Sequence, residues 1–340
     1  MAHETARWEQ LLETRRGRSA GLPLLVAIEI RYNPRPARHD PTEPFLPFHR
    51  MLRECSQWDE RGHRFLVSVF DGGMGCVPVH EPYENKIVDE ETLVSAAPFP
   101  GLSNLGFRID HARNRVVCCA SDKFDYALST VVAYSYDTWE TLFVVKLQEG
   151  ADNKSLADDL TIDPDGNIYV TDTYNGKIWK INPEGTEFSV FSDDPQFKLD
   201  PENEYYGWVR LNGIVYHPNG FLLVSHLAAH ALFKVSMDGK TVTRVGGLTR
   251  ELLGDGIALK DENTLVMAGL DVGIHVLETS DNWETAVEAY HSPAESSILL
   301  PTSVSIKNGE PFVGFANLMP SDPPVNLIAT PDFSAIPPPP

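Results

Sequence analysis

One short pattern recurs along most of this chain: a polar residue opens a short apolar strand, and a polar turn and a second strand follow. The two clearest copies are LADDLTIDPDGNIYVTDT, from Leu156, and RLNGIVYHPNGFLLVSHL, from Arg210. Looser copies begin at Arg53, Ser103 and Gly254. A repeated small β-sheet is the sequence signature of a β-propeller, in which each copy forms one blade around a central channel. The repeats therefore predict an all-β propeller with the opening residues gathered at one end of its channel.

The spacing of the copies predicts six blades and a way to close the ring. The opening residues recur every 43 to 54 residues, which is the length of one four-stranded blade. They are Glu54, Asn104, Asp158, Asn212, Asp255 and, in a weaker sixth copy, Thr302. After this sixth opening residue only three strands fit, so we expect Leu24–Ile30 (LLVAIEI) to supply the outer strand of the last blade and cover its open edge. The predicted organisation is a lead with the closing strand at 1–50, a six-bladed propeller at 51–330 and a Pro-rich tail at 331–340.

Charge and composition restrict the partners. The formal net charge of −20 argues against binding to nucleic acid or to an anionic membrane, and no apolar run reaches the length of a membrane helix. We therefore expect a small-molecule partner. The start, MAHETARWEQLLETRR, lacks the apolar core of a secretory signal, so we expect a cytoplasmic protein, or a secreted one whose signal was removed.

The four cysteines are few for a disulfide scaffold. Cys118 and Cys119 are adjacent in a strand pattern, so we expect them to be core thiols that point to opposite faces of the sheet. Cys55 and Cys76 lie on the first copy, and a disulfide between them remains open.

Four of the opening residues stand at the same position in their copies of the repeat and offer carboxylate or carboxamide oxygens: Glu54, Asp158, Asn212 and Asp255. The first strand of a blade lies nearest the channel, so these side chains should converge. Carboxylate and carboxamide oxygens are the ligands of hard cations such as Ca²⁺. Asp-Gly and Asn-Gly are also common turn dipeptides, and Glu54 alone would be a solvated residue. The matching phase in four copies favours a shared cation site.

The same segments resemble the superfamily of senescence marker protein, gluconolactonase and luciferin-regenerating enzyme, whose kin are the paraoxonases and strictosidine-synthase-like propellers. The resemblance covers about residues 50–320, and LNGIVY with PTSVSI is closest to an uncharacterised plant and fungal branch. It implies a six-bladed propeller with one divalent metal, Ca²⁺ or Zn²⁺, in the channel, and an enzyme that opens lactones or esters. The implied ligands are Glu54, Asp158, Asn212 and Asp255, and Asp255 is also the implied catalytic base.

Two departures from the family pattern weaken the expected hydrolysis, and the loss of the arginine, together with the aromatic residues of the connection at 192–209, favours an alternative. Asp158 replaces the usual Asn, and Leu156 stands where a substrate-binding Arg is common. The alternative is a non-hydrolytic enzyme of natural-product metabolism, such as a condensing enzyme or a hetero-Diels–Alder-type cyclase, which orients its reactants and works without a metal. A third hypothesis is a binding propeller without chemistry, but the channel residues argue against it.

Loops over the same face of the propeller are expected to form the pocket wall. SHLAAH, from Ser225, resembles a paraoxonase loop, which makes His226 a candidate catalytic residue, although a loop histidine is more often structural. The long connection at 192–209 is typical of a lid, and its aromatic residues would either wall the pocket or hold the loop down. The candidate substrate contacts are Asn104, Tyr174, Tyr205, Tyr206, Trp208 and His230.

Overall fold

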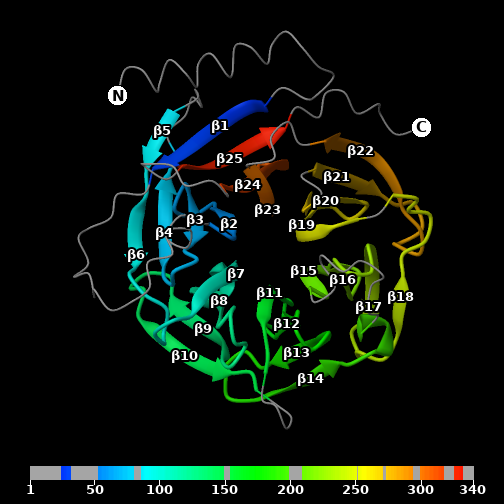
Figure 1. Cartoon of the computed structure of the whole chain (residues 1–340), viewed down its shortest axis with the longest axis horizontal. Helices are drawn as coiled ribbons and strands as arrows, with labels where there is room; N and C mark the ends of the chain where they lie inside the picture. The colour runs from blue at the N-terminus through cyan, green and yellow to red at the C-terminus, as the bar shows by residue number, and fades with distance from the viewer. Residues whose placement is uncertain are drawn as a thin grey trace.

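The computed structural model describes residues 24–31, 53–79, 86–148, 154–198, 209–250, 252–270, 273–293, 299–317 and 325–331. Their strands form six sheets arranged in a ring around a central axis, which confirms the predicted six-bladed propeller (Figure 1). The tail from residue 332 and the lid aromatics Tyr205, Tyr206 and Trp208 lie outside the described residues. Within the described part of the chain, no helix has the length and apolar character needed to cross a membrane.

Five blades are four-stranded antiparallel sheets, and each runs from a first strand at the centre to a fourth strand at the rim (Figure 1). Blade 1 comprises β2 (Ser56–Asp59), β3 (Arg64–Ser68), β4 (Met74–Pro78) and β6 (Glu91–Val94). Blade 2 comprises β7 (Ser103–Asp110), β8 (Arg115–Ser121), β9 (Ser129–Ser135) and β10 (Thr141–Lys146), with a 3₁₀ turn, η2 (His111–Arg113), between its first two strands. Blade 3 comprises β11 (Ala157–Ile162), β12 (Ile168–Asp172), β13 (Lys177–Ile181) and β14 (Phe188–Ser192), and the 3₁₀ turn η3 (Pro195–Lys198) follows it. Blade 4 comprises β15 (Leu211–His217), β16 (Phe221–His226), β17 (Ala231–Ser236) and β18 (Val242–Arg244). Blade 5 comprises β19 (Gly254–Asp261), β20 (Thr264–Gly269), β21 (Gly273–Glu278) and β22 (Val287–Pro293).

Blade 6 closes the ring with a strand from the beginning of the chain. It contains β23 (Leu299–Lys307), β24 (Glu310–Asn317), β25 (Val325–Pro331) and then β1 (Leu24–Arg31), which runs antiparallel to β25. This confirms the predicted closing strand. A further strand that the sequence did not predict, β5 (Lys86–Asp89), pairs in parallel with the other edge of β1. The N-terminal strand is therefore held on both edges.

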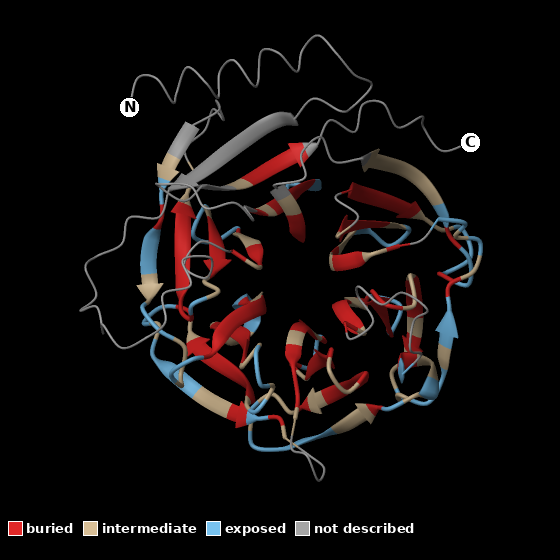
Figure 2. Cartoon of the chain, in the orientation of Figure 1, coloured by how far each residue is buried: buried red, intermediate tan, exposed pale blue. Residues whose placement is uncertain are grey.

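The apolar core lies between neighbouring blades, and most buried residues sit on the inner strands (Figure 2). All four cysteines are buried and free, so the Cys55–Cys76 disulfide does not form. The reason is geometric: Cys55 directly precedes β2, Cys76 lies on β4, and β3 lies between these two strands. Two strand spacings put the two backbones about 10 Å apart, beyond the reach of a disulfide. Cys118 packs with Phe107 in one core cluster and Cys119 packs in another, which confirms that they point to opposite faces.

Candidate functional site

The inner strands share an irregularity near their channel end. In blades 2 to 5 the register with the second strand shifts across two consecutive residues, and in blade 6 it shifts across one. The residues within these bulges are Leu105 and Gly106, Asp158 and Asp159, Asn212 and Gly213, Asp255 and Gly256, and Thr302. Bulges are typical next to active sites, because they release a side chain from the ladder and re-aim it. The channel end of this propeller is thus built from one repeated local distortion.

A small cavity of about 20 Å³ lies at these bulges and takes residues from all six blades. The four predicted channel residues, Glu54, Asp158, Asn212 and Asp255, all line it. Its other lining residues are Cys55, Gln57, Gly106, Arg108, Asp159, Gly256, Ile257, Thr302, Ser303 and Val304. The structure therefore brings together in one place the side chains that the repeats put in phase.

Asn104 does not share this position. The bulge in β7 puts Leu105, not Asn104, at the place that the channel acids occupy in the other blades. The Asn104 side chain is fully buried, and its Nδ2 donates to the carbonyl of Gly73 at 2.9 Å. The bulge in blade 2 begins one residue later than the repeat pattern predicts. The Asn104 side chain therefore links blades 1 and 2 instead of lining the cavity.

The acids around the cavity carry more negative charge than their surroundings compensate. Burial, reinforced by the charge of Asp159, raises the pKa of Glu54 to about 7, although Lys123 acts in the opposite direction. Burial and the charges of Glu54 and Asp159 raise the pKa of Asp158 well above its usual range. Burial and the charges of Glu54, Asp158 and Asp159 do the same for Asp255. These groups would be stabilised either by protons or by a bound cation.

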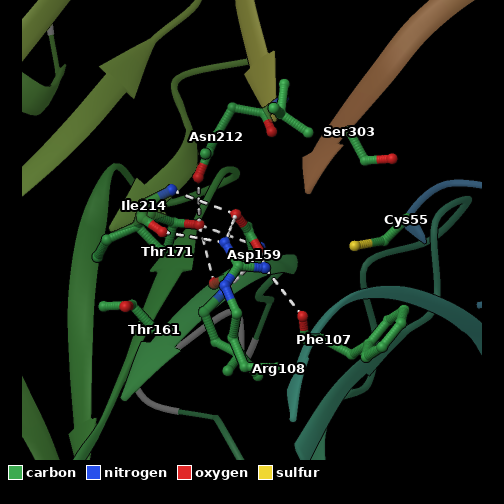
Figure 3. A network of polar contacts seen from close by, with 12 residues as sticks. Cys55, Phe107, Arg108, Asp159, Thr161, Thr171, Asn212, Ile214 and Ser303 are labelled. Carbon is green, nitrogen blue, oxygen red and sulfur yellow. Dashed lines mark hydrogen bonds and ion pairs between the residues drawn. The ribbon is translucent and has the colours of Figure 1, made fainter. Parts of the chain in front are cut away.

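Two charged residues at the cavity were not predicted from the sequence. Asp159 stands in a bulge where blades 2, 4 and 5 have glycine, and Arg108 points at it from β7 (Figure 3). Nη1 and Nη2 of Arg108 lie 3.1 and 3.0 Å from Oδ1 and Oδ2 of Asp159. Nη2 also donates to the carbonyl of Ile214 at 3.2 Å, and the amide of Ile214 donates to Asp159 at 3.3 Å. This bidentate pair therefore joins blades 2, 3 and 4.

The signal for this pair was present in the repeats. The copies read NG at 212–213 and DG at 255–256 but DD at 158–159. A glycine is required elsewhere because a Cβ on Gly213 would lie 2.3 Å from the carbonyl oxygen of Asp255 in the next blade. Asp159 stands at the equivalent position of blade 3, so its buried carboxyl needs a partner. Arg108, on the first strand of blade 2, is that partner.

We expect Arg108→Met to destabilise the protein by about 3–5 kcal/mol, because it removes the counter-charge of the buried Asp159 carboxyl beside three other acids. The double variant Arg108→Met/Asp159→Asn should recover at least half of that loss. Arg61→Met is the matched control: it breaks an exposed ion pair with Asp137 and should cost no more than about 1 kcal/mol. Urea unfolding measures all three, and equal losses in the buried and exposed variants would contradict the assignment.

His226 is not among the residues that line the cavity, and both of its ring nitrogens are bonded to the backbone. Its Nε2 donates to the carbonyl of Phe197 at 3.0 Å, and its Nδ1 accepts from the amide of Ala229 at 3.0 Å. The ring is fully buried, and burial lowers its pKa to about 4, so it is neutral at pH 7. This geometry supports a structural role, in which the neutral ring fastens η3 to the turn after β16.

The two other candidates that the structure describes, His230 and Tyr174, lie in loops. His230 is half-buried in the turn after β16, where its φ of 50° is left-handed and its amide donates to the carbonyl of Leu227 at 3.0 Å. Tyr174, in the loop between β12 and β13, stacks on Tyr126 with ring centroids 4.9 Å apart. Neither residue is among those that line the cavity.

The side chains that line the cavity have the chemistry of ligands for a hard cation, but they are not spaced as a metal site requires. Their donors are carboxylate and carboxamide oxygens, the ligands that Ca²⁺ prefers, and burial together with the neighbouring acids raises the pKa values of Glu54 and Asp255. However, among the residues that the structure describes, no three His, Cys, Asp or Glu side chains are grouped closely enough to hold a metal ion. The acids surround a common space without forming a finished coordination shell.

Comparisons with known proteins support the propeller fold. The NHL repeat family matches residues 156–181, which span β11 to β13 of blade 3. Comparison with curated proteins gives no significant match.

Solved structures similar to this one are propellers of different kinds. The major allergen Mala s 1 of Malassezia sympodialis is 15% identical with a TM-score of 0.63, and the alignment covers 84% of this chain and 95% of the allergen. A catalytically inactive variant of virginiamycin B lyase from Staphylococcus aureus, solved with quinupristin, is 12% identical with a TM-score of 0.55 and coverages of 84% and 97%. A streptogramin B lyase is 10% identical, with a TM-score of 0.54 and coverages of 84% and 95%. At such low identity these similarities show the fold alone.

Proposed function

We propose that this protein is an enzyme that binds a small molecule at the channel cavity and opens a lactone or an ester with the help of Ca²⁺. One observation carries the proposal: Glu54, Asp158, Asn212 and Asp255 reach a common cavity from four different blades. Gathering acids in this way raises their pKa values and costs stability unless something compensates their charge. A divalent cation would do so. The resemblance of the same segments to the gluconolactonase superfamily supports the same chemistry.

The proposed roles follow from the positions of the side chains. Glu54, Asn212 and Asp255 would hold the cation, with Asp158 in or next to its shell, and a bound cation would polarise the substrate carbonyl. Asp255 would accept the proton of the attacking water. The enclosed space of about 20 Å³ has room for a cation or a water molecule, so the substrate would have to approach it from the channel mouth.

A second candidate function is a non-hydrolytic enzyme that orients its reactants. It is favoured by the spacing of the described acids, since no three of them are grouped closely enough to hold a metal ion. Two of the similar propellers are also lyases by name, so their chemistry is not hydrolysis. In this case the protonated acids and Asn212 would serve as hydrogen-bond partners of the reactants, and catalysis would come from positioning.

A panel of aliphatic and aromatic lactones and aryl esters distinguishes the two functions. We expect turnover of at least one member in the presence of Ca²⁺, and loss of that turnover in excess chelator, because the cation carries charge that develops in the transition state. Circular dichroism of the chelated protein serves as the control for folding. Turnover that is unchanged by chelation in a folded protein would contradict the hydrolase proposal and support the second function.

A further inference from the structure

Two buried hydroxyl groups lie against the channel bulges, and the proposed chemistry does not use them. They belong to Thr171 on β12 and Ser225 on β16, the second strands of blades 3 and 4, and both residues are fully buried. Each stands at the same point of its blade, one position before the residue that pairs with the last residue ahead of the bulge. The repeat therefore places one hydroxyl beside each of these two bulges.

The two hydroxyls make the same pair of contacts. Thr171 Oγ1 lies 2.7 Å from the carbonyl oxygen of Asn212, in the bulge of the next blade, and 3.1 Å from that of Asp159, in the bulge of its own blade (Figure 3). Ser225 Oγ lies 3.2 Å from the carbonyl oxygen of Asp255, again in the next blade, and 3.3 Å from the second bulge carbonyl of its own blade. A hydroxyl has one hydrogen to donate, and in both cases the shorter contact is to the next blade.

The carbonyls that these hydroxyls contact belong to residues that the bulges take out of register. Asn212 and Asp255 have no opposing residue on the second strand of their own blades. A buried carbonyl without a hydrogen bond costs free energy, and a neighbouring hydroxyl removes that cost. The same hydrogen bond holds the peptide that follows each residue in one orientation. Because the backbone sets the direction in which a bulged side chain points, each hydroxyl also restrains the side chain that reaches the cavity.

The hydroxyl is not a feature of every blade. The equivalent residues are Cys119 in blade 2 and Ala268 in blade 5, and both belong to apolar clusters. Among the four blades with a two-residue bulge, blades 3 and 4 are thus the two that supply a hydroxyl. Each is followed by a blade whose first bulge residue, Asn212 or Asp255, is a proposed ligand of the cation. The hydroxyls therefore coincide with two of the residues whose position matters most for the site.

We propose that Thr171 and Ser225 are positioning residues, which hold the backbone of Asn212 and Asp255 and so limit the directions in which these two side chains reach into the cavity. As a statement about cation binding, this rests on the function proposed above. As a statement about the two bulges, it stands on the hydroxyl contacts alone. Since a cation requires its ligands at fixed distances, loss of either hydroxyl should affect cation binding more than loss of a hydroxyl that joins blades elsewhere.

The chain offers a matched control for each hydroxyl. Thr161 also joins β11 of blade 3 to β15 of blade 4: it is buried, and its Oγ1 accepts from the amide of Tyr216 at 2.9 Å. Ser305 is the control for Ser225, since it is buried and its Oγ accepts from the amide of Trp58 at 2.6 Å, between blades 6 and 1. None of these control residues or their partners lines the cavity.

Calorimetric titration with Ca²⁺ at pH 8 compares the variants. We expect Thr171→Val and Ser225→Ala each to weaken Ca²⁺ binding about tenfold, and Thr171→Ser, which keeps the hydroxyl, to bind within about threefold of the unaltered protein. Thr161→Val and Ser305→Ala should also bind within about threefold, although thermal unfolding in EDTA should show comparable losses of stability in all four hydroxyl-free variants. Equal weakening in the control variants, or unchanged affinity in Thr171→Val or Ser225→Ala, would overturn the inference and leave the cation site standing.

NMR of the cation-free protein tests the positioning role even if the chain takes up no Ca²⁺, a result that would sink the proposed function. We expect the side-chain amide of Asn212 to give one sharp pair of signals in the unaltered protein and in Thr161→Val. In Thr171→Val the signals should be broadened or doubled, because the released bulge would exchange between orientations. Signals as sharp in Thr171→Val as in Thr161→Val would overturn the positioning role.

Discussion

Deletion of residues 1–31 is expected to leave a chain that cannot form a soluble, cooperatively folded protein. The deletion removes β1, which pairs with β25 over most of its length and with β5 on its other edge. Without it, β25 would become an open edge and β5 would lose its only strand partner among the described residues. The ring would then be held together at this point only by the contacts between blades 1 and 6.

Thermal unfolding and size-exclusion chromatography measure this effect. The matched control is deletion of residues 1–22, which keeps β1 from Leu24 and should unfold in one cooperative transition near the temperature of the full chain. An unchanged melting temperature after deletion of 1–31 would show that the closing strand does not stabilise the ring.

Asp255→Asn is expected to lower the rate of lactone or ester opening by about 10²- to 10⁴-fold, because an amide can neither accept the proton of water nor balance the charge of a cation. The loss should appear in kcat more than in KM, since the proposed role is in the transition state. Asp261→Asn is the matched control: this residue lies at the far end of the same strand, β19, and is exposed.

The rates of the two variants can be compared only if both proteins are fully folded. Asp255 is buried and its carboxyl pKa is raised, so replacing it by a neutral amide should not destabilise the protein and should raise its melting temperature in the absence of cation. A rate for Asp255→Asn within a factor of about three of the Asp261→Asn rate would remove Asp255 from the mechanism and favour a pocket that works by positioning.

The repeats were enough to predict the fold, because blade number follows from the spacing of the copies. The closing strand was predictable too, since only three strands fit after Thr302 and a propeller needs a covered edge. β5 was not predictable: its four residues, KIVD, carry no register signal, and their partner β1 is more than fifty residues away in sequence. Whether β5 pairs with β1 depends on where the closing strand lies in the folded ring.

The candidate site was partly predictable for the same reason. Glu54, Asp158, Asn212 and Asp255 share a phase in the repeats, and the structure places all four at the cavity. Asn104 was misplaced because a bulge, which shifts register by one residue, cannot be counted from a single strand sequence. The backbone contacts of His226 were equally hidden, because its partner Phe197 lies in the preceding inter-blade connection.

Arg108 shows a different limit of the sequence. Its position in SNLGFRID gives no indication of whether the side chain faces the channel or the neighbouring blade. Only the placement of three adjacent first strands shows that it meets Asp159 and Ile214 (Figure 3). A pair that spans three blades is a property of the closed ring, not of any one copy of the repeat.

Calorimetric titration with Ca²⁺ tests most directly whether the channel acids act together. At pH 8 we expect one site per chain, and at pH 5.5 an affinity at least about tenfold lower, because Glu54, with a pKa of about 7, and the other acids of raised pKa hold protons that the cation must displace. Glu54→Gln and Asp255→Asn should each weaken binding strongly, while Asp261→Asn should bind as the unaltered protein does. A folded protein that takes up no Ca²⁺ at pH 8, or that binds it equally well after Asp255→Asn, would contradict the account.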